Sequence, residues 1–189
     1  PAEGCERSGA VSPTVQKANA DMAAQLPLSD PQDLQDAQHG LIARPTGKIV
    51  AADGTVLRDF GAYGFLDGPA PATVNPSLWR HAQLNAQVGL FKVTDGVWQL
   101  RGFDIANMTL IEGQTGWIVV DPLSSRESAA FALAFARQHL GPKPVSALVF
   151  THAHVDHFGG ALGVVSPQEV AARKIPVVAS IGFMEEATS

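Results

Sequence analysis

The stretch Val149–Gly160, "VFTHAHVDHFGG", places three histidines and an aspartate within six consecutive positions after an apolar run. The run "VSALVF", residues 145–150, is typical of a buried strand, so the polar residues begin at the carboxyl end of that strand. Either a metal site or a polar loop that is merely rich in histidine could explain the pattern. Imidazoles and a carboxylate without a shared partner would lose hydration for no gain, which favours the metal site.

The spacing of these side chains suits metal ions. In an extended chain after Phe150, His152 and His154 point the same way and Asp156 follows them. A turn at Asp156 and His157 would aim this second pair at a neighbouring position. Imidazole nitrogen and carboxylate oxygen suit Zn²⁺, and two ions roughly 3.5 to 4 Å apart would share a bridging hydroxide. We therefore predict a metal-bound water as the catalytic nucleophile, with His152, His154, Asp156 and His157 as metal ligands.

Two further features bear on this site. Gly159 and Gly160 are expected to let the backbone turn tightly behind the ligands. Cys5 is the only cysteine, so neither an intrachain disulfide nor a thiolate metal cluster can form, and its distance from the histidines in sequence argues against a cysteine nucleophile.

Composition limits the class of protein. With 189 residues, 46% of them hydrophobic and 16% charged, the chain is expected to fold as one globular domain with a terminal extension. The net charge of -5 and the scattered basic residues argue against nucleic-acid binding. No apolar run approaches the length of about 20 residues that a membrane helix needs, so no membrane span is predicted.

The first 45 residues are predicted to form an N-terminal helical extension. Ser12 and Pro13 supply a helix start, and apolar residues then recur at helical spacing as far as Leu26. Asp30-Pro31 repeats the start signal, and Gly40 can end the second helix in a left-handed conformation.

Residues 46–189 are predicted to form a sheet-rich α/β structure. Three hairpins are expected, in "KIVAADGTVL" (48–57), "LFKVTDGVWQLR" (90–101) and "MTLIEGQTGWIVVD" (108–121), with a short helix from Asn75-Pro76 before the second of them. Ser124 and Glu127 predict a capping box for a helix that Gly141-Pro142 ends. Strand and helix then alternate, with a helix starting at Ser166, a strand in "IPVVAS" (175–180) and a helix in "FMEEATS" (183–189). Glu185 and Glu186 on that last helix are expected to be solvated.

The pattern H-x-H-x-D-H after a hydrophobic strand resembles the metal-binding signature of the metallo-β-lactamase superfamily. The resemblance implies an αββα sandwich with a dinuclear zinc site at one edge, of which residues 46–189 would be the N-terminal portion. Asp121, in "GWIVVDP", stands where the superfamily has a supporting aspartate that hydrogen-bonds near the metals. An ordinary Asp-Pro turn is the alternative for this residue.

Longer stretches, "TVNPSLWRHAQLNAQVGLFKVTDGVWQLRGFDIANMTLIEGQTGWIVVDPL" and "VFTHAHVDHFGG", resemble the alkylsulfatase branch of SDS-hydrolase and secondary-alkylsulfatase enzymes. This implies hydrolysis of a small-molecule alkyl sulfate to an alcohol and inorganic sulfate. By the same resemblance, His152 and His154 would hold one Zn²⁺, and Asp156 and His157 would help to hold a second. The loop "RGFDIANMT" is the candidate wall for the alkyl chain, and its candidate contacts are Phe103, Asn107 and Met108. For Phe103 and Met108, packing in the core or in a hairpin is the alternative.

The resemblance also implies parts beyond Ser189: further metal ligands, sulfate-binding residues and regions that form a homodimer. We therefore expect the chain to be the N-terminal part of a longer periplasmic or secreted enzyme. Two alternatives stay open. One is another hydrolase of the superfamily, such as a lactonase or a β-lactamase-like enzyme, and the other is a metal-binding module without catalysis.

Overall fold

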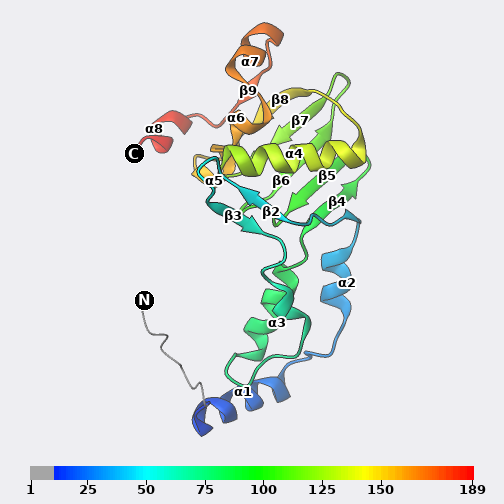
Figure 1. Cartoon of the computed structure of the whole chain (residues 1–189), viewed down its shortest axis with the longest axis vertical. Coiled ribbons are helices and arrows are strands. Elements are labelled where there is room, and N and C mark those ends of the chain that lie inside the picture. Colours follow the sequence, from blue (N-terminus) through cyan, green and yellow to red (C-terminus); the bar gives the residue numbers. More distant parts are fainter. Residues whose placement is uncertain (1–10) are drawn as a thin grey trace. The chain divides into compact units, whose positions relative to one another are not determined.

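The computed structural model describes residues 11–189 (Figure 1). Cys5 and the first ten residues of the predicted extension lie outside the described residues. The chain divides into two compact units. One takes in Pro1–Ala37 and Tyr63–Ala86, and the other takes in Gln38–Ala62 and Gln87–Ser189. The domain boundary predicted between residues 45 and 46 stays a prediction.

The smaller unit is mainly helical. Its elements are α1 (Pro13–Gln25), α2 (Gln32–Gln38), the 3₁₀-helix η1 (Gly64–Asp67) and α3 (Pro76–Asn85). The predicted helix starts are confirmed: the Ser12 hydroxyl accepts a hydrogen bond from the Val15 N–H, and the Asn75 side chain accepts from the N–H groups of Ser77 and Leu78. Each of these helices has a proline in its first turn, where a missing N–H costs nothing.

The larger unit contains a seven-stranded sheet in the order β1-β4-β5-β6-β7-β8-β9 and a separate two-stranded sheet, β2-β3. The strands are β1 (Leu41–Ala43), β2 (Lys48–Val50), β3 (Val56–Asp59), β4 (Gly89–Thr94), β5 (Val97–Arg101), β6 (Met108–Glu112), β7 (Trp117–Val120), β8 (Val145–Val149) and β9 (Val177–Val178). Pairing is antiparallel from β1 to β7 and parallel for β8 and β9. The three predicted hairpins are confirmed as β2/β3, β4/β5 and β6/β7.

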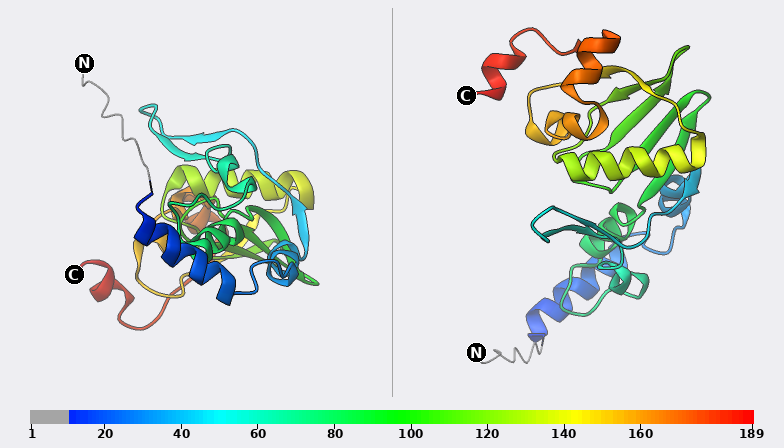
Figure 2. Two further views of the ribbon diagram at one scale, coloured as in Figure 1. Left: turned by 90° about the horizontal axis from the view of Figure 1, so that it is seen from below. Right: turned by 45° about the horizontal axis from the view of Figure 1, so that its top comes forward.

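Helix α4 (Arg126–Leu140) links β7 to the parallel strand β8 and lies across one face of the large sheet (Figure 2). Apart from Leu133, its buried side chains are small, mostly alanines, which lets the helix approach the sheet closely. They join the buried residues of the sheet, among them Leu110, Val119 and Leu148, in one apolar cluster. The burial of this face removes apolar area from water and fixes the helix against the sheet.

The predicted capping box at the start of α4 is wrong in detail. Ser125, and not Ser124, is the N-cap, and its hydroxyl accepts a hydrogen bond from the Ser128 N–H at 3.0 Å. Ser124 instead donates its hydroxyl to Asp104, which lies on the loop between β5 and β6. Either of two adjacent serines can cap a helix. Because the Ser124 side chain bonds to Asp104, Ser125 caps α4.

After β8 the chain forms four short helices, α5 (Val155–Phe158), α6 (Ala161–Val164), α7 (Pro167–Arg173) and α8 (Phe183–Ala187). The predicted start of α7 is confirmed, since Ser166 and Glu169 exchange the two hydrogen bonds of a capping box. Hydrogen bonds from the backbone and the hydroxyl of Ser166 lower the pKa of the Glu169 carboxyl. Within residues 11–189, no helix has both the length and the apolar character needed to cross a membrane.

Candidate metal centre

The histidine loop, residues 151–160, begins where β8 ends and turns at once into α5. The predicted extended path does not reach Asp156, because the helix begins at Val155 and His154 is its N-cap. This early turn gathers the imidazole rings. The ring centroid of His152 lies 4.6 Å from that of His154 and 4.1 Å from that of His157.

Asp121 connects the end of β7 to the histidine loop. One oxygen of its nearly buried carboxylate, Oδ1, accepts a hydrogen bond from the Thr151 N–H at 2.9 Å. The other, Oδ2, accepts from the Thr151 hydroxyl at 2.7 Å and lies 2.8 Å from Nδ1 of His157. The backbone of Asp121 has φ 53, a left-handed conformation that is unusual for a residue other than glycine. One carboxylate thus holds two residues of the loop.

This network determines which ring nitrogens carry protons. A carboxylate only accepts hydrogen bonds, so Nδ1 of His157 donates to Asp121. The single Thr151 hydroxyl proton is directed to Asp121, so Thr151 Oγ1 accepts from Nδ1 of His152, which lies 2.9 Å away. In the neutral form of each ring, these bonds place the proton on Nδ1 and leave the lone pair on Nε2, the form in which imidazole binds a metal.

The donor set fits a zinc ion in its chemistry. Three imidazoles and a carboxylate stand together, and Asp156 Oδ2 lies 3.3 Å from Nε2 of His157, a contact that needs a proton or a metal ion between the two atoms. Within residues 11–189, however, no three His, Cys, Asp or Glu side chains converge closely enough to hold a metal ion. The loop thus supplies suitable donors without arranging three of them around one point.

Gly159 and Gly160 are required for a different reason from the predicted one. Their φ angles of -57 and -83 are accessible to any residue, so no special turn is involved. A Cβ atom at Gly160 would collide with the carbonyl oxygen of Pro122 and lie 2.6 Å from that of Ser125. At Gly159 it would collide with the carbonyl oxygen of Ser124. These glycines let the histidine loop lie directly on the chain between β7 and α4.

The three candidate substrate contacts are placed differently from one another. Phe103 and Met108 have no exposed surface and belong to the apolar cluster beneath the sheet, which favours the packing alternative for both. Asn107 is exposed, so a role in substrate binding stays a prediction for it. Glu185 and Glu186 are exposed on α8, as predicted.

The sequence analysis did not single out Thr151 or Asp104, and it assigned Ser124 only to helix capping. Thr151 stands directly before His152, and a hydroxyl beside a predicted ligand is a signal that could have been used. The Asp104–Ser124 pair spans 20 residues between two loops, and no local pattern indicates it.

Comparison with known proteins finds a matching family and several relatives. Residues 101–189 match the metallo-beta-lactamase superfamily. The alkyl/aryl-sulfatase BDS1 of Saccharomyces cerevisiae is 46% identical over 92% of this chain and 27% of its own length. An (R)-specific secondary-alkylsulfatase of a Pseudomonas species is 48% identical over 90% of this chain and 26% of its own length.

A solved structure of an alkylsulfatase has a similar fold over most of this chain. The stereoselective inverting sec-alkylsulfatase Pisa1 from Pseudomonas sp. superposes with a TM-score of 0.88 and 47% identity, over 94% of this chain and 28% of that chain. Residues 101–189 are thus similar to the metallo-beta-lactamase superfamily, and the predicted α/β fold class is confirmed. The chain is also similar to alkylsulfatases, of whose length it spans about a quarter.

Replacing Gly160 by alanine tests whether close packing positions the histidine loop. We expect the variant to lose about 1 to 3 kcal/mol of unfolding free energy, because a Cβ there collides with backbone atoms that cannot move aside. Urea unfolding followed by circular dichroism measures this. Gly64→Ala is the control, since a Cβ at Gly64 meets nothing within 4 Å. Equal stability of the two variants would contradict the packing argument.

Proposed function

We propose that the full-length protein containing this chain hydrolyses sulfate monoesters of aliphatic alcohols to the alcohol and inorganic sulfate. The observation that carries the proposal is the Asp121–Thr151–His157 network on the histidine loop, in a chain that is 43 to 48% identical to three alkylsulfatases over about nine tenths of its length. Because the chain spans about a quarter of those relatives, the activity is proposed for the whole protein.

His152 and His154 would hold one Zn²⁺, and Asp156 and His157 would contribute to holding a second. Zinc bound there would supply an activated water and offset negative charge on the sulfate group. Asp121 orients His157 directly and His152 through Thr151, so that both rings present Nε2. Because the described residues contain no converging group of three donors, we propose that the full-length protein supplies further ligands from other segments. Homodimer formation and a periplasmic or secreted location are proposed from the family resemblance.

Metal dependence and substrate class can be tested together. We expect the full-length protein to release inorganic sulfate from dodecyl sulfate or from a secondary alkyl sulfate such as 2-octyl sulfate. Treatment with a chelator should lower the rate by at least about tenfold, and added Zn²⁺ should restore it. Ion chromatography of the released sulfate measures both effects.

The same assay separates the alternatives. Turnover of an acyl lactone or a cephalosporin without sulfate release would identify another hydrolase of the superfamily. Stoichiometric zinc binding without turnover of any of these substrates would identify a metal-binding module.

Replacing Asp121 by asparagine tests the role of the carboxylate. An amide nitrogen at the Oδ2 position would donate to Nδ1 of His157 and force the proton onto Nε2, the atom needed for metal. We expect zinc affinity to fall by about 10- to 100-fold, the usual cost of losing a partner that orients a ligand. Competition with a chromogenic chelator measures the affinity.

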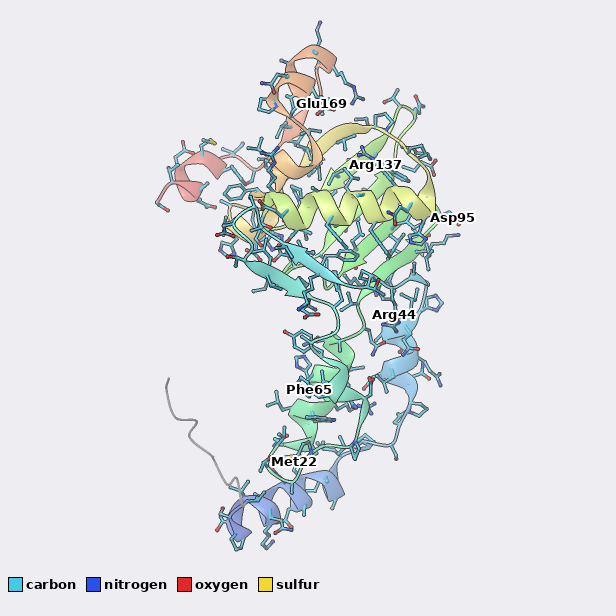
Figure 3. All side chains as sticks on the ribbon, in the orientation of Figure 1. Met22, Arg44, Phe65, Asp95, Arg137 and Glu169 are labelled. Carbon is cyan, nitrogen blue, oxygen red and sulfur yellow. The ribbon has the colours of Figure 1, made fainter. Side chains whose placement is uncertain are left out.

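Asp95→Asn is the matched control, because Asp95 is an exposed carboxylate in the turn between β4 and β5 that pairs with Lys92 (Figure 3). It should bind zinc like the unaltered protein. If Asp121→Asn and Asp95→Asn bind zinc equally well, the orienting role of Asp121 is wrong.

A further inference from the structure

The segment Asp121–Ser125, here called the support loop, holds the histidine loop at several points. Besides the Asp121 carboxylate, the Leu123 carbonyl oxygen accepts a hydrogen bond from the Gly160 N–H at 2.8 Å. Carbonyl groups of the same segment form the surface on which Gly159 and Gly160 lie. The position of the support loop therefore sets the position of the histidine loop.

The support loop has an unfavourable backbone conformation. Asp121 and Leu123 have φ angles of 53 and 64, in the left-handed region that residues with a Cβ atom seldom adopt. The Leu123 N–H donates to the Asp121 carbonyl oxygen at 2.9 Å, which closes a tight turn. Strained backbone of this kind persists only where surrounding contacts hold it.

Asp104 supplies such a contact from the loop between β5 and β6. Its Oδ2 accepts hydrogen bonds from the Ser124 hydroxyl at 2.5 Å and from the Ser124 N–H at 3.2 Å. Its Oδ1 accepts from the Ile105 N–H at 2.7 Å, which fixes the carboxylate on its own loop. The short bond to the hydroxyl is typical of an ionised acceptor and is stronger than a bond between neutral groups.

The sheet brings these two loops to the same edge. The pairs Leu100↔Met108 and Thr109↔Val120 place the end of β5, the start of β6 and the end of β7 side by side. Asp104 and the histidine loop therefore both contact the support loop. Asp104 is hydrogen-bonded to Ser124, the backbone of the support loop joins Ser124 to Asp121, and Asp121 is hydrogen-bonded to His157.

We infer that Asp104 is a positioning residue for the metal-binding histidines, acting through Ser124 and the support loop. The expected effect on zinc affinity rests on the proposed function. That Asp104 holds the support loop, and with it the histidine loop, does not depend on zinc.

The test compares Asp104→Asn, Ser124→Ala and the double variant with Asp95→Asn in the full-length protein. In the metal-free protein, hydrogen exchange by mass spectrometry follows peptides from Thr151–Gly160. The N–H groups of Thr151 and Gly160 are bonded to the support loop, so in Asp104→Asn we expect their exchange to be faster by about five- to tenfold. Peptides from β4, Gly89–Thr94, should be unchanged.

Zinc affinity is the second readout. The dissociation constant should rise by about three- to tenfold in Asp104→Asn, less than for a residue that contacts a ligand directly. Ser124→Ala keeps its backbone N–H bond to Asp104, so its effect should be smaller. The double variant should match Asp104→Asn within about twofold, because the Ser124 hydroxyl acts only through Asp104.

Four outcomes are distinguished. Unchanged exchange of Thr151–Gly160 in Asp104→Asn would overturn the inference. Faster exchange confined to residues 102–107, with zinc affinity preserved, would also overturn it, since Asp104 would then stabilise only its own loop. If Asp104→Asn fails to fold, Ser124→Ala carries the same test. Absence of zinc binding in the unaltered protein would overturn the proposed function. The exchange of Thr151–Gly160 would still decide whether Asp104 positions the histidine loop.

Discussion

The carboxylate of Asp121 is the interaction on which the candidate site depends. It is nearly buried, and its hydrogen-bond partners all belong to the histidine loop, 30 and 36 residues further along the chain. A buried carboxylate is stable only when donors surround it, so the loop and the carboxylate stabilise each other. The same bonds also orient the two rings and, in their neutral forms, favour the proton on Nδ1 of His152 and His157.

The parallel arrangement of β7 and β8 makes that interaction possible. Both strands end at the same edge of the sheet, so Asp121 and Thr151 follow directly from neighbouring strand ends. Helix α4 forms most of the connection between them. The glycines of the histidine loop lie against the chain just before α4 begins. Packing, strand register and hydrogen bonding thus fix the same few residues, which is what precise placement of metal donors requires.

Much of this could be predicted from the sequence because its signals are local. Asp-Gly turns predict two of the hairpins, and Ser-Pro and Asn-Pro predict helix starts. The metal donors read from H-x-H-x-D-H stay a prediction. The failures have a common cause in tertiary contacts. Ser124 was expected to cap α4 but bonds to Asp104, and the glycines expected to shape a turn instead make room for backbone. Asp104 and Thr151 were missed because their partners are 20 and 30 residues away.

The burial of Phe103 and Met108 illustrates the same limit. The segment "RGFDIANMT" alternates apolar and polar residues, and the sequence alone does not say which face meets the core. In the fold, Phe103 contacts the aromatic rings of Phe60, Phe131 and Phe135, which assigns it to packing. Asn107, between two buried residues, is left facing outward.

The central claim is that the histidine loop holds zinc. The most direct measurement is a crystal structure of the full-length protein grown with Zn²⁺, with diffraction recorded on both sides of the zinc absorption edge. We expect anomalous density at about 2.0 to 2.2 Å from ring nitrogens of His152 and His154, with Asp156 and His157 at the same density or at a second peak beside it. Zinc density elsewhere in the protein, with none at this loop, would contradict it.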